Sequence, residues 1–376
     1  MKRAQVPVVR LTHLPQHAGY TDWLLTGLGL LDAQGVLRLE APSAAKASAN
    51  RAYRGLQRRL PRSLRFLPEA APPYQIMAGL VRFCDKTVRF AYDMLDSPYE
   101  FDEWLLERCD VYFKCQCPLY INALGFPLTR RVFVPFSQVA LDHQGKIVPA
   151  MLGRPLASSW SLRDNMAALD RWRALQQVPK KALLLASYGS GEAPTPSWAP
   201  GECAMLESLQ GLVQHPNLKR RVLVDWLRAR NDQNIRARIG NAESAVQGKY
   251  ADSAEDFARV VAESVYELNV SGLRRSVTFR FATCLTVGTT VISDSLAVKW
   301  YRPFEIGTEL VEIGELGYEL PDEAEWGSAF EALNLILEKG FTEESERRHA
   351  VLARFESVWR PDKLAEYLVE ECLSRA

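Results

Sequence analysis

Short apolar runs recur along this chain, and stretches with the spacing of helices separate them. Residues 6–11 (VPVVRL), 182–187 (ALLLAS) and 289–293 (TTVIS) have the length and composition of buried strands. Strands that alternate with helices are typical of mostly parallel sheets with helices on both faces. The sequence therefore predicts an α/β fold.

The chain is too long for one ordinary core. It has 376 residues, and a polar helical stretch at residues 155–180 separates two series of strands and helices. We therefore predict an α/β domain at residues 1–174 and a second at residues 175–357. Ligands of parallel sheets bind at the carboxyl ends of the strands, so the cleft between the two domains is the expected ligand site.

The net charge, the apolar runs and the cysteine content limit the kinds of partner and the cellular setting that we expect. The net charge is +1, so no overall positive field points to nucleic acid, and we expect no nucleic-acid partner. No apolar run reaches the ~18 residues of a membrane span, and the start of the chain reads as a strand and not as a signal peptide. The seven cysteines are odd in number and irregularly spaced. A reduced, cytoplasmic protein is the expected setting.

A metal site is not expected. Three cysteines fall within residues 109–117 (CDVYFKCQC), but no fourth ligand lies at short spacing. We interpret these cysteines as buried and inert.

Residues 271–295 combine a serine- and glycine-containing loop, a helical stretch, Gly288, an apolar strand and Asp294. Arg274 and Arg275 precede the helix predicted at residues 277–287. Arg280 falls in its first turns. Cations near a helix N-terminus are disfavoured by roughly 0.3–1 kcal/mol each, so an anion such as phosphate is expected there.

These arginines also have a simpler interpretation. They are either solvated, or paired with Glu267 or Asp294. The order of elements around them favours the anion site over this alternative.

The same run resembles the donor-binding segment of GT-B glycosyltransferases, in particular exostosin-like and related bacterial sugar transferases. Those families have a pattern like R-x-x-x-[ST]-[FY]-R-[FY]-x-E-A-L-A-x-G-x-x-P-V-I, and here the run is RRSVTFRFATCLTVGTTVISD. The matching positions are Arg274, Thr278, Phe279, Arg280, Phe281, Leu285, Gly288 and Ile292. The resemblance covers about forty residues well.

The resemblance implies two Rossmann-like domains that face a cleft, with a nucleotide-sugar donor in the second domain. The diphosphate would lie near Arg275 and Arg280, and Thr278 and Asn269 would complete the donor contacts. The sugar would pass to a hydroxyl of a glycan, a lipid-linked sugar or a protein. Arginine and the helix dipole would offset the charge without a metal or another cofactor. A terminal helix at residues 358–376 would return to the first domain.

Thr283 departs from the pattern, because the families have glutamate there. Threonine can hydrogen-bond but carries no charge. This departure leaves open an unusual donor or a loss of activity. The alternative function is a non-catalytic sugar- or nucleotide-binding protein on the same scaffold.

Three other places are candidates. Gly189 and Ser190 lie in a loop after a predicted strand and would bind phosphate through backbone N–H groups, although an ordinary surface loop explains them equally well. If the reaction inverts configuration, His17 is the first candidate for the base that deprotonates the acceptor, and Asp85 is the second. Their simpler interpretations are a surface histidine and a salt-bridged aspartate.

The stretch from residue 46 to residue 66 is basic, lacks acidic residues and carries interleaved apolar side chains. It would contact an anionic membrane surface or an anionic glycan, or form a solvated loop. A membrane contact would place the protein on the inner face of the membrane. The arginines in question are Arg51, Arg54, Arg58, Arg59, Arg62 and Arg65.

Overall fold

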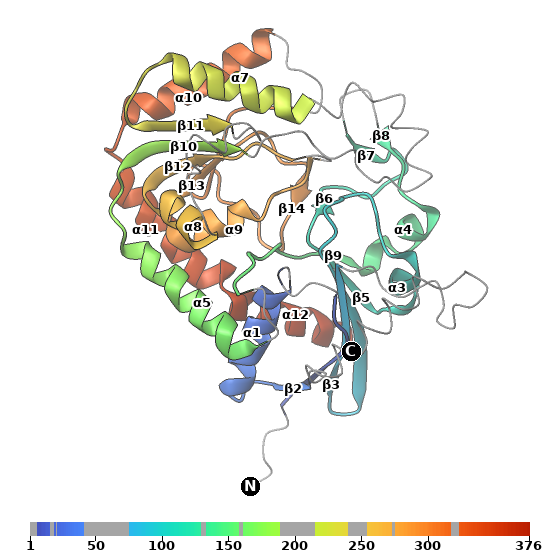
Figure 1. Cartoon of the computed structure of the whole chain (residues 1–376). Helices are drawn as coiled ribbons and strands as arrows, with labels where there is room; N and C mark the ends of the chain where they lie inside the picture. Colours follow the sequence, from blue (N-terminus) through green and yellow to red (C-terminus); the bar gives the residue numbers. More distant parts are fainter. Residues whose placement is uncertain are drawn as a thin grey trace, which may run out of the picture.

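The computed structural model describes residues 6–15, 19, 21–40, 75–128, 133–157, 161–188, 215–239, 254–272, 275–316 and 323–376. Within these ranges the chain forms a six-stranded and a five-stranded sheet, with helices packed around them (Figure 1). The predicted α/β class is confirmed.

The first sheet has the order β2-β1-β3-β4-β5-β9. Its strands are β1 (Val8–His13), β2 (Arg38–Glu40), β3 (Ile76–Phe83), β4 (Lys86–Asp93), β5 (Val111–Lys114) and β9 (Ile147–Pro149). β3 is antiparallel to both β1 and β4, whereas the remaining pairs are parallel. The expectation of a Rossmann-like sheet in the first half is therefore wrong at its centre. A two-residue hairpin joins β3 to β4, and so short a connection permits only antiparallel pairing.

The second sheet is parallel throughout, as predicted, with the order β11-β10-β12-β13-β15. Its strands are β10 (Ala182–Tyr188), β11 (Ile235–Ile239), β12 (Ser264–Leu268), β13 (Thr290–Ser293) and β15 (Leu310–Glu312). Every residue of β12 and β13 is buried, which is typical of a parallel sheet covered on both faces.

Two pairs of helices cover the second sheet. One apolar cluster joins the sheet to α7 (His215–Ala229) and α10 (Glu323–Lys339). A second cluster contains side chains of α8 (Ala254–Ala262) and α9 (Arg280–Val287), and it continues into the core around the first sheet. In Figure 1, α8 and α9 accordingly lie between the second sheet and the first half of the chain.

The first sheet packs against helices from both ends of the chain. α12 (Pro361–Ser374) lies against α1 (Asp22–Ala33) and against β3 and β4. Gly27 of α1 makes this approach close, because a Cβ atom there would lie 1.9 Å from the carbonyl oxygen of Pro361. The short helices α3 (Glu103–Arg108) and α4 (Gln138–Asp142) lie next to each other on one side of β5 (Figure 1).

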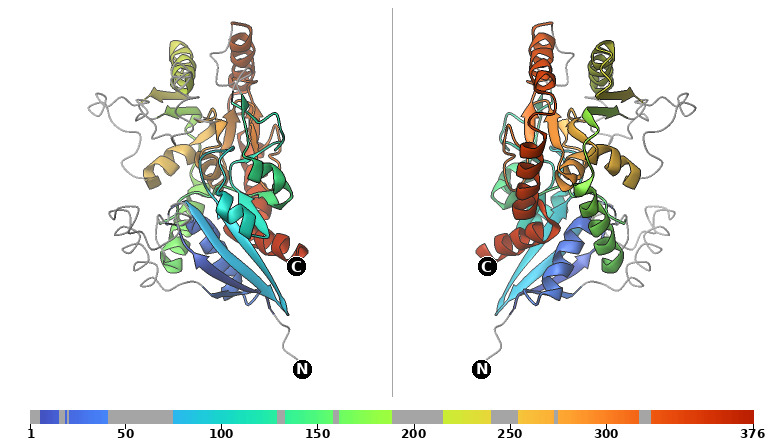
Figure 2. Two further views of the ribbon diagram at one scale, coloured as in Figure 1. Left: turned by 90° about the vertical axis from the view of Figure 1, so that its right-hand side faces the viewer. Right: turned by 90° about the vertical axis from the view of Figure 1, so that its left-hand side faces the viewer.

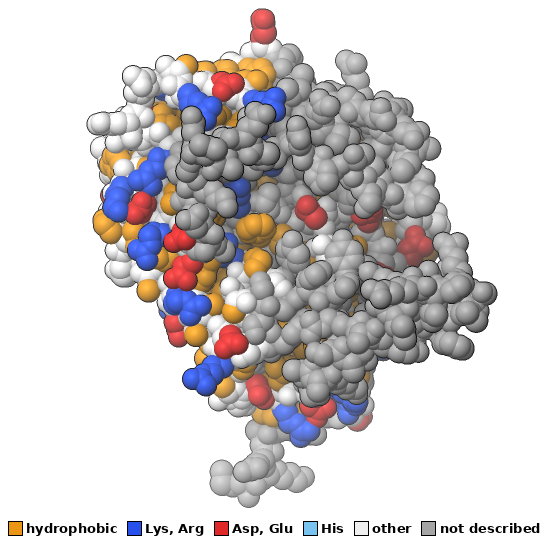
Figure 3. Space-filling model, in the orientation of Figure 1, with side chains coloured by type: hydrophobic (Ala, Val, Ile, Leu, Met, Phe, Trp, Pro, Cys, Tyr) orange, Lys and Arg blue, Asp and Glu red, His pale blue; other side chains and the backbone are white. Residues whose placement is uncertain are grey.

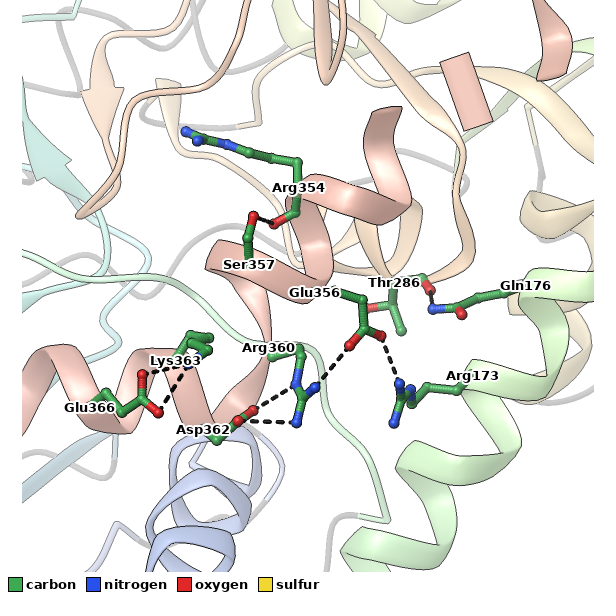
Figure 4. A network of polar contacts seen from close by, with 10 residues as sticks. All are labelled: Arg173, Gln176, Thr286, Arg354, Glu356, Ser357, Arg360, Asp362, Lys363 and Glu366. Carbon is green, nitrogen blue, oxygen red and sulfur yellow. Dashed lines mark hydrogen bonds and ion pairs between the residues drawn. The ribbon is translucent and has the colours of Figure 1, made fainter. Parts of the chain in front are cut away.

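The chain passes between the sheets twice. It leaves the first half through α5 (Leu162–Ala174), and it returns through α11 (Glu344–Arg354) and the π-helical turn Phe355–Trp359. Glu356 ties the two passages together, because it accepts hydrogen bonds from Arg173 of α5 and from Arg360, each at 2.8 Å (Figure 4). Arg360 also forms a two-pronged contact with Asp362 of α12.

Among the described residues, four short strands form two further sheets of two strands each. β6 (Cys117–Pro118) pairs with β14 (Val298–Lys299), and β7 (Phe126–Pro127) pairs with β8 (Phe133–Val134). The two views of Figure 2 place α7 and α10 at the opposite end of the molecule from the β3–β4 hairpin. No helix within the described ranges has the length and hydropathy needed to cross a bilayer. On the face in Figure 3, basic and acidic side chains are interspersed.

Candidate functional site

The strand order of the second sheet defines one place where a ligand crevice is expected. The chain runs from β10 outward to β11 on one side and then resumes on the other side with β12. At such a reversal the loops after the two central strands diverge, and ligands of open α/β sheets bind outside the carboxyl ends there. These ends are Tyr188 of β10 and Leu268 of β12.

Arg280 lies at this point. Its Nη1 donates a hydrogen bond to the carbonyl oxygen of Ser187 in β10 and is 3.7 Å from Oε1 of Glu267 in β12. Its guanidinium carbon is 5.2 Å from the ring centroid of Phe257. The side chain remains 21% exposed. The guanidinium therefore connects the ends of both central strands, and the side chain stays partly exposed.

Tyr188 is flanked by two arginines. Its ring centroid is 5.9 Å from the guanidinium carbon of Arg280 and 5.2 Å from that of Arg220 in α7. The hydroxyl donates to the carbonyl oxygen of Leu268 at 2.9 Å. Burial raises the pKa of Tyr188, so the ring stays neutral between two cations. Two positive charges therefore converge on the carboxyl end of β10.

Glu267 is the residue that sequence reasoning used only as a possible partner of the arginines. Its side chain is fully buried, and its Oε2 accepts a hydrogen bond from the thiol of Cys284. Its Oε1 has no hydrogen-bond partner among the described residues. Burial raises the pKa of Glu267, and the charge of Arg280 partly opposes this rise. A glutamate inside an otherwise uncharged, fully buried strand (SVYEL) is the signal in the sequence.

Asn269 and Thr278 lie beside Arg280, and they bond to each other. The Asn269 side-chain amide donates to Thr278 Oγ1 at 3.0 Å, and Thr278 Oγ1 accepts the backbone N–H of Arg280 at 3.3 Å. α9 begins at Arg280, three residues later than predicted. The pair thus fixes the start of α9 relative to the end of β12.

Arg275 is held by the protein itself. Its backbone has a φ of 56°, a left-handed conformation that costs a residue with a Cβ about 1–2 kcal/mol. Its side chain is buried, donates to the carbonyl oxygen of Pro127 in β7 at 3.2 Å and lies 3.5 Å from the Glu315 carboxylate. Arg275 therefore fastens the loop before α9 to the first half of the chain.

Thr283 is also engaged within the protein. It is fully buried, and its hydroxyl accepts a hydrogen bond from Arg154 at 2.8 Å. Arg154 comes from the segment before α5, and its guanidinium carbon lies 3.4 Å from the ring centroid of Trp172. Burial lowers the pKa of Arg154 to about 9. Thr283 thus joins α9 to the first half of the chain.

Asp85 does not lie where the sequence analysis expected it. It is exposed in the turn between β3 and β4, at the edge of the sheet opposite the carboxyl ends of β4 and β5. The error follows from the antiparallel direction of β3. At the opposite edge, Lys114 is buried and forms a structural salt bridge with Asp93 at 2.7 Å.

Several predicted residues lie outside the described ranges. They are His17, Gly189, Ser190, Arg274 and the basic-segment arginines Arg51, Arg54, Arg58, Arg59, Arg62 and Arg65. Their roles stay predictions.

No family model matches the sequence, and no curated protein matches it significantly. Among solved structures, a chain of the crystal structure of the GtfA/B complex is similar, with 11% identity and a TM-score of 0.35. The match covers 79% of this chain and 63% of that one. A TM-score of this size does not identify a fold, so the proposals below rest on the residues and their geometry. The described residues define an α/β protein with charged side chains gathered at the carboxyl end of a parallel sheet.

Proposed function

We propose that this protein is a glycosyltransferase that binds a nucleotide-sugar donor at the carboxyl ends of β10 and β12. One observation carries the proposal. Arg280 and Arg220 flank Tyr188 at the same place where the buried carboxylate of Glu267 has one oxygen that accepts no hydrogen bond from the described residues. Two cations suit a diphosphate, and a carboxylate oxygen suits sugar hydroxyls.

The roles of the phosphate-binding groups follow from their chemistry. Arg280 stands at the first position of α9, so its guanidinium and the helix N-terminus act on the same anion. Their stabilisation grows as charge develops on the leaving diphosphate. Gly189 and Ser190 follow the last residue of β10 in sequence and would add backbone N–H donors. Arg274 would add a further cation.

The other candidate residues around α9 hold this helix in position. Asn269 and Thr278 hold its first residue, while Arg275 and Thr283 connect it to the first half of the chain. These contacts keep Arg280 in one place, which is the main requirement for electrostatic catalysis.

The residues proposed to act on the acceptor are known from the sequence alone. His17 would accept the proton of an acceptor hydroxyl in a glycan, a lipid-linked sugar or a protein, if the reaction inverts configuration. No metal and no further cofactor enters this scheme. The basic segment with Arg51 and Arg65 would hold the protein on the cytoplasmic face of a membrane.

A non-catalytic sugar- or nucleotide-binding protein is the second candidate. The contact between Thr283 and Arg154 favours it, because α9 offers no carboxylate there and the hydroxyl is already engaged. Binding without turnover separates this candidate from the first.

The test is incubation with UDP-, GDP-, CMP- and dTDP-sugars and measurement of nucleotide release. The proposal predicts release from one donor class, and a fall of about ten- to hundredfold in Glu267→Gln, because a hydrogen bond to a charged group is lost. Lys181→Gln is the matched control, since Lys181 is exposed at the other end of the sheet. Binding without release identifies the second candidate. Absence of both binding and release contradicts both.

A further inference from the structure

An exposed apolar loop connects β6 to β7 and comprises residues 119–124 (LYINAL). Tyr120 and Leu124 are each 76% exposed, and Leu119 is 42% exposed. Phe133, which pairs with Pro127 on the adjacent β7–β8 ribbon, is 47% exposed. Large apolar side chains gathered on one loop mark a contact surface.

The apolar loop is held firmly at its start. The backbone N–H of Leu119 donates to the carbonyl oxygen of Ala297 at 3.2 Å, and Nζ of Lys299 donates to the Leu119 carbonyl at 3.1 Å. The backbone contact extends the pairing of β6 with β14, and the Lys299 side chain adds a second contact beside it. The protein therefore fixes the direction in which the loop leaves the surface.

Its far end is equally constrained. The backbone N–H of Gly125 donates to the carbonyl oxygen of Asn122 at 3.1 Å, and the Asn122 side chain accepts the N–H of Leu124 at 3.0 Å. Gly125 has a φ of 88°, and a Cβ atom there would lie 2.5 Å from the carbonyl oxygen of Val134. The exposure of Tyr120 and Leu124 is thus built into an ordered turn.

From this geometry we propose that the apolar loop inserts into the interfacial region of a lipid bilayer. Six residues and one neighbouring side chain offer far less than the roughly 800 Å² that each partner gives to a stable protein interface. Insertion into lipid needs no complementary surface, and Tyr and Leu suit the boundary between headgroups and acyl chains.

Charge around the apolar loop agrees with a lipid surface. The sequence from residue 111 to residue 141 contains no aspartate or glutamate. Lys299 at the base of the loop is exposed. Anionic headgroups would therefore meet no opposing charge from this segment.

Hydrogen bonds connect the ends of the apolar loop to segments that border the candidate site. Arg275, which precedes α9, donates to Pro127 just beyond the loop, and Ala297 follows β13. If the proposed function holds, a membrane-borne acceptor would meet the protein beside its donor site. The membrane contact itself does not depend on the proposed function.

The experiment is sedimentation of the full chain with vesicles of phosphatidylcholine and phosphatidylglycerol, and with phosphatidylcholine vesicles in high salt. High salt screens the attraction between the basic residues 46–65 and the vesicle surface. The binding that remains is then due to the apolar side chains. We expect the double variant Tyr120→Ser, Leu124→Ser to bind the vesicles at least about tenfold more weakly than wild type under both conditions. Leu335→Ser on α10, where Leu335 is 57% exposed, is the control and should partition like wild type.

A second measurement uses wild type alone. Hydrogen exchange at the amides of residues 119–124 is expected to slow when vesicles are added. Equal partitioning of the double variant and wild type would overturn the proposal, and so would unchanged exchange at these amides. Wild-type self-association that disappears in the double variant would instead identify a protein partner.

Discussion

Glu267 and Arg280 form an unequal pair at the residue scale. The Glu267 carboxylate is fully buried, whereas the Arg280 side chain is 21% exposed, and its Nη1 lies 3.7 Å from the carboxylate, too far for a hydrogen bond. A buried carboxylate oxygen that accepts no hydrogen bond lowers the stability of the folded chain. Such a cost is common where a ligand supplies the missing partner, which is why this pair carries the proposed function.

Replacing Glu267 with Gln is expected to stabilise the unliganded protein. Burial raises the pKa of Glu267 above its ordinary value of 4.5, so the folded chain holds that proton more tightly than the unfolded chain. Stability is therefore lost as the pH rises from the unfolded pKa through the folded pKa, and the loss persists at neutral pH. We expect Glu267→Gln to increase the free energy of unfolding by about 1 kcal/mol at neutral pH, with the gain vanishing below the unfolded pKa.

Glu263, immediately before β12, is the control with the opposite sign. Partial burial acts to raise its pKa, but hydrogen bonds from Lys181 and Arg236 outweigh this and lower it. Glu263→Gln should therefore destabilise the protein at neutral pH, by at most about 1 kcal/mol. Urea unfolding across acidic to neutral pH measures both variants. Destabilisation by Glu267→Gln at neutral pH would contradict the account.

At the scale of elements, α9 connects the candidate site to the rest of the molecule. Its first residue is Arg280, and its C-terminal cap is Gly288 in the left-handed conformation. The sequence predicted the cap and the strand that follows, because glycine and β-branched residues have strong local preferences. The resemblance to the donor-binding segment of GT-B glycosyltransferases implied that Asn269, Thr278 and Arg280 lie together, and hydrogen bonds join them in the structure.

Other features of the site depend on contacts that are distant in sequence. The bond between Thr283 and Arg154 spans 129 positions, and Arg275 meets Pro127 across 148. No local pattern encodes such pairs. The direction of β3 was missed for a different reason. Its antiparallel pairing follows from the two-residue connection to β4, and the apolar runs alone do not reveal strand direction.

Gly288→Ala tests the packing of the end of α9. The φ of 74° disfavours any residue with a Cβ, and the added atom would lie 2.9 Å from Cγ of Leu352 in α11. We expect a loss of about 2–3 kcal/mol of unfolding free energy, from backbone strain and overpacking together.

Gly314→Ala provides the control for backbone strain. Gly314 has a φ of 97°, and nothing lies within 4 Å of its Cβ position. Its alanine variant should lose only the strain component, about 1–2 kcal/mol. Equal losses in the two variants, measured by chemical denaturation, would mean that Leu352 does not pack tightly on the end of α9.

At the scale of the whole molecule, two further features of the described residues join the sheets. One is the apolar core that continues from the first sheet to α9, and the other is the pair of chain passages linked by Glu356 (Figure 4). α12 then returns from the second half to lie on α1. The position of Arg280 relative to the first half therefore depends on how the two ends of the chain pack together.

Gly27→Ala tests the packing of α12 on α1. Inside an isolated helix, alanine is more favourable than glycine by about 1 kcal/mol. Here the added Cβ would lie 1.9 Å from the carbonyl oxygen of Pro361. We expect the opposite sign, a loss of about 3 kcal/mol, because the clash is with backbone and is relieved only if α12 moves.

Gly145→Ala is its control, because nothing lies within 4 Å of that Cβ position. Thermal unfolding of both variants should show a large fall in midpoint for Gly27→Ala and almost none for Gly145→Ala. A stabilised Gly27→Ala would mean that α12 does not lie on α1.

The most direct test of the candidate site is thermal unfolding with UDP, GDP, CMP and dTDP, on wild type, Arg280→Gln and Arg259→Gln. Arg259 is exposed on the neighbouring α8 and serves as the matched control. At about a hundredfold excess over Kd, a bound nucleotide should stabilise wild type by about 2.7 kcal/mol. The account predicts stabilisation by one nucleotide, retained in Arg259→Gln and lost in Arg280→Gln. No stabilisation by any nucleotide, or equal stabilisation of Arg280→Gln, would contradict it.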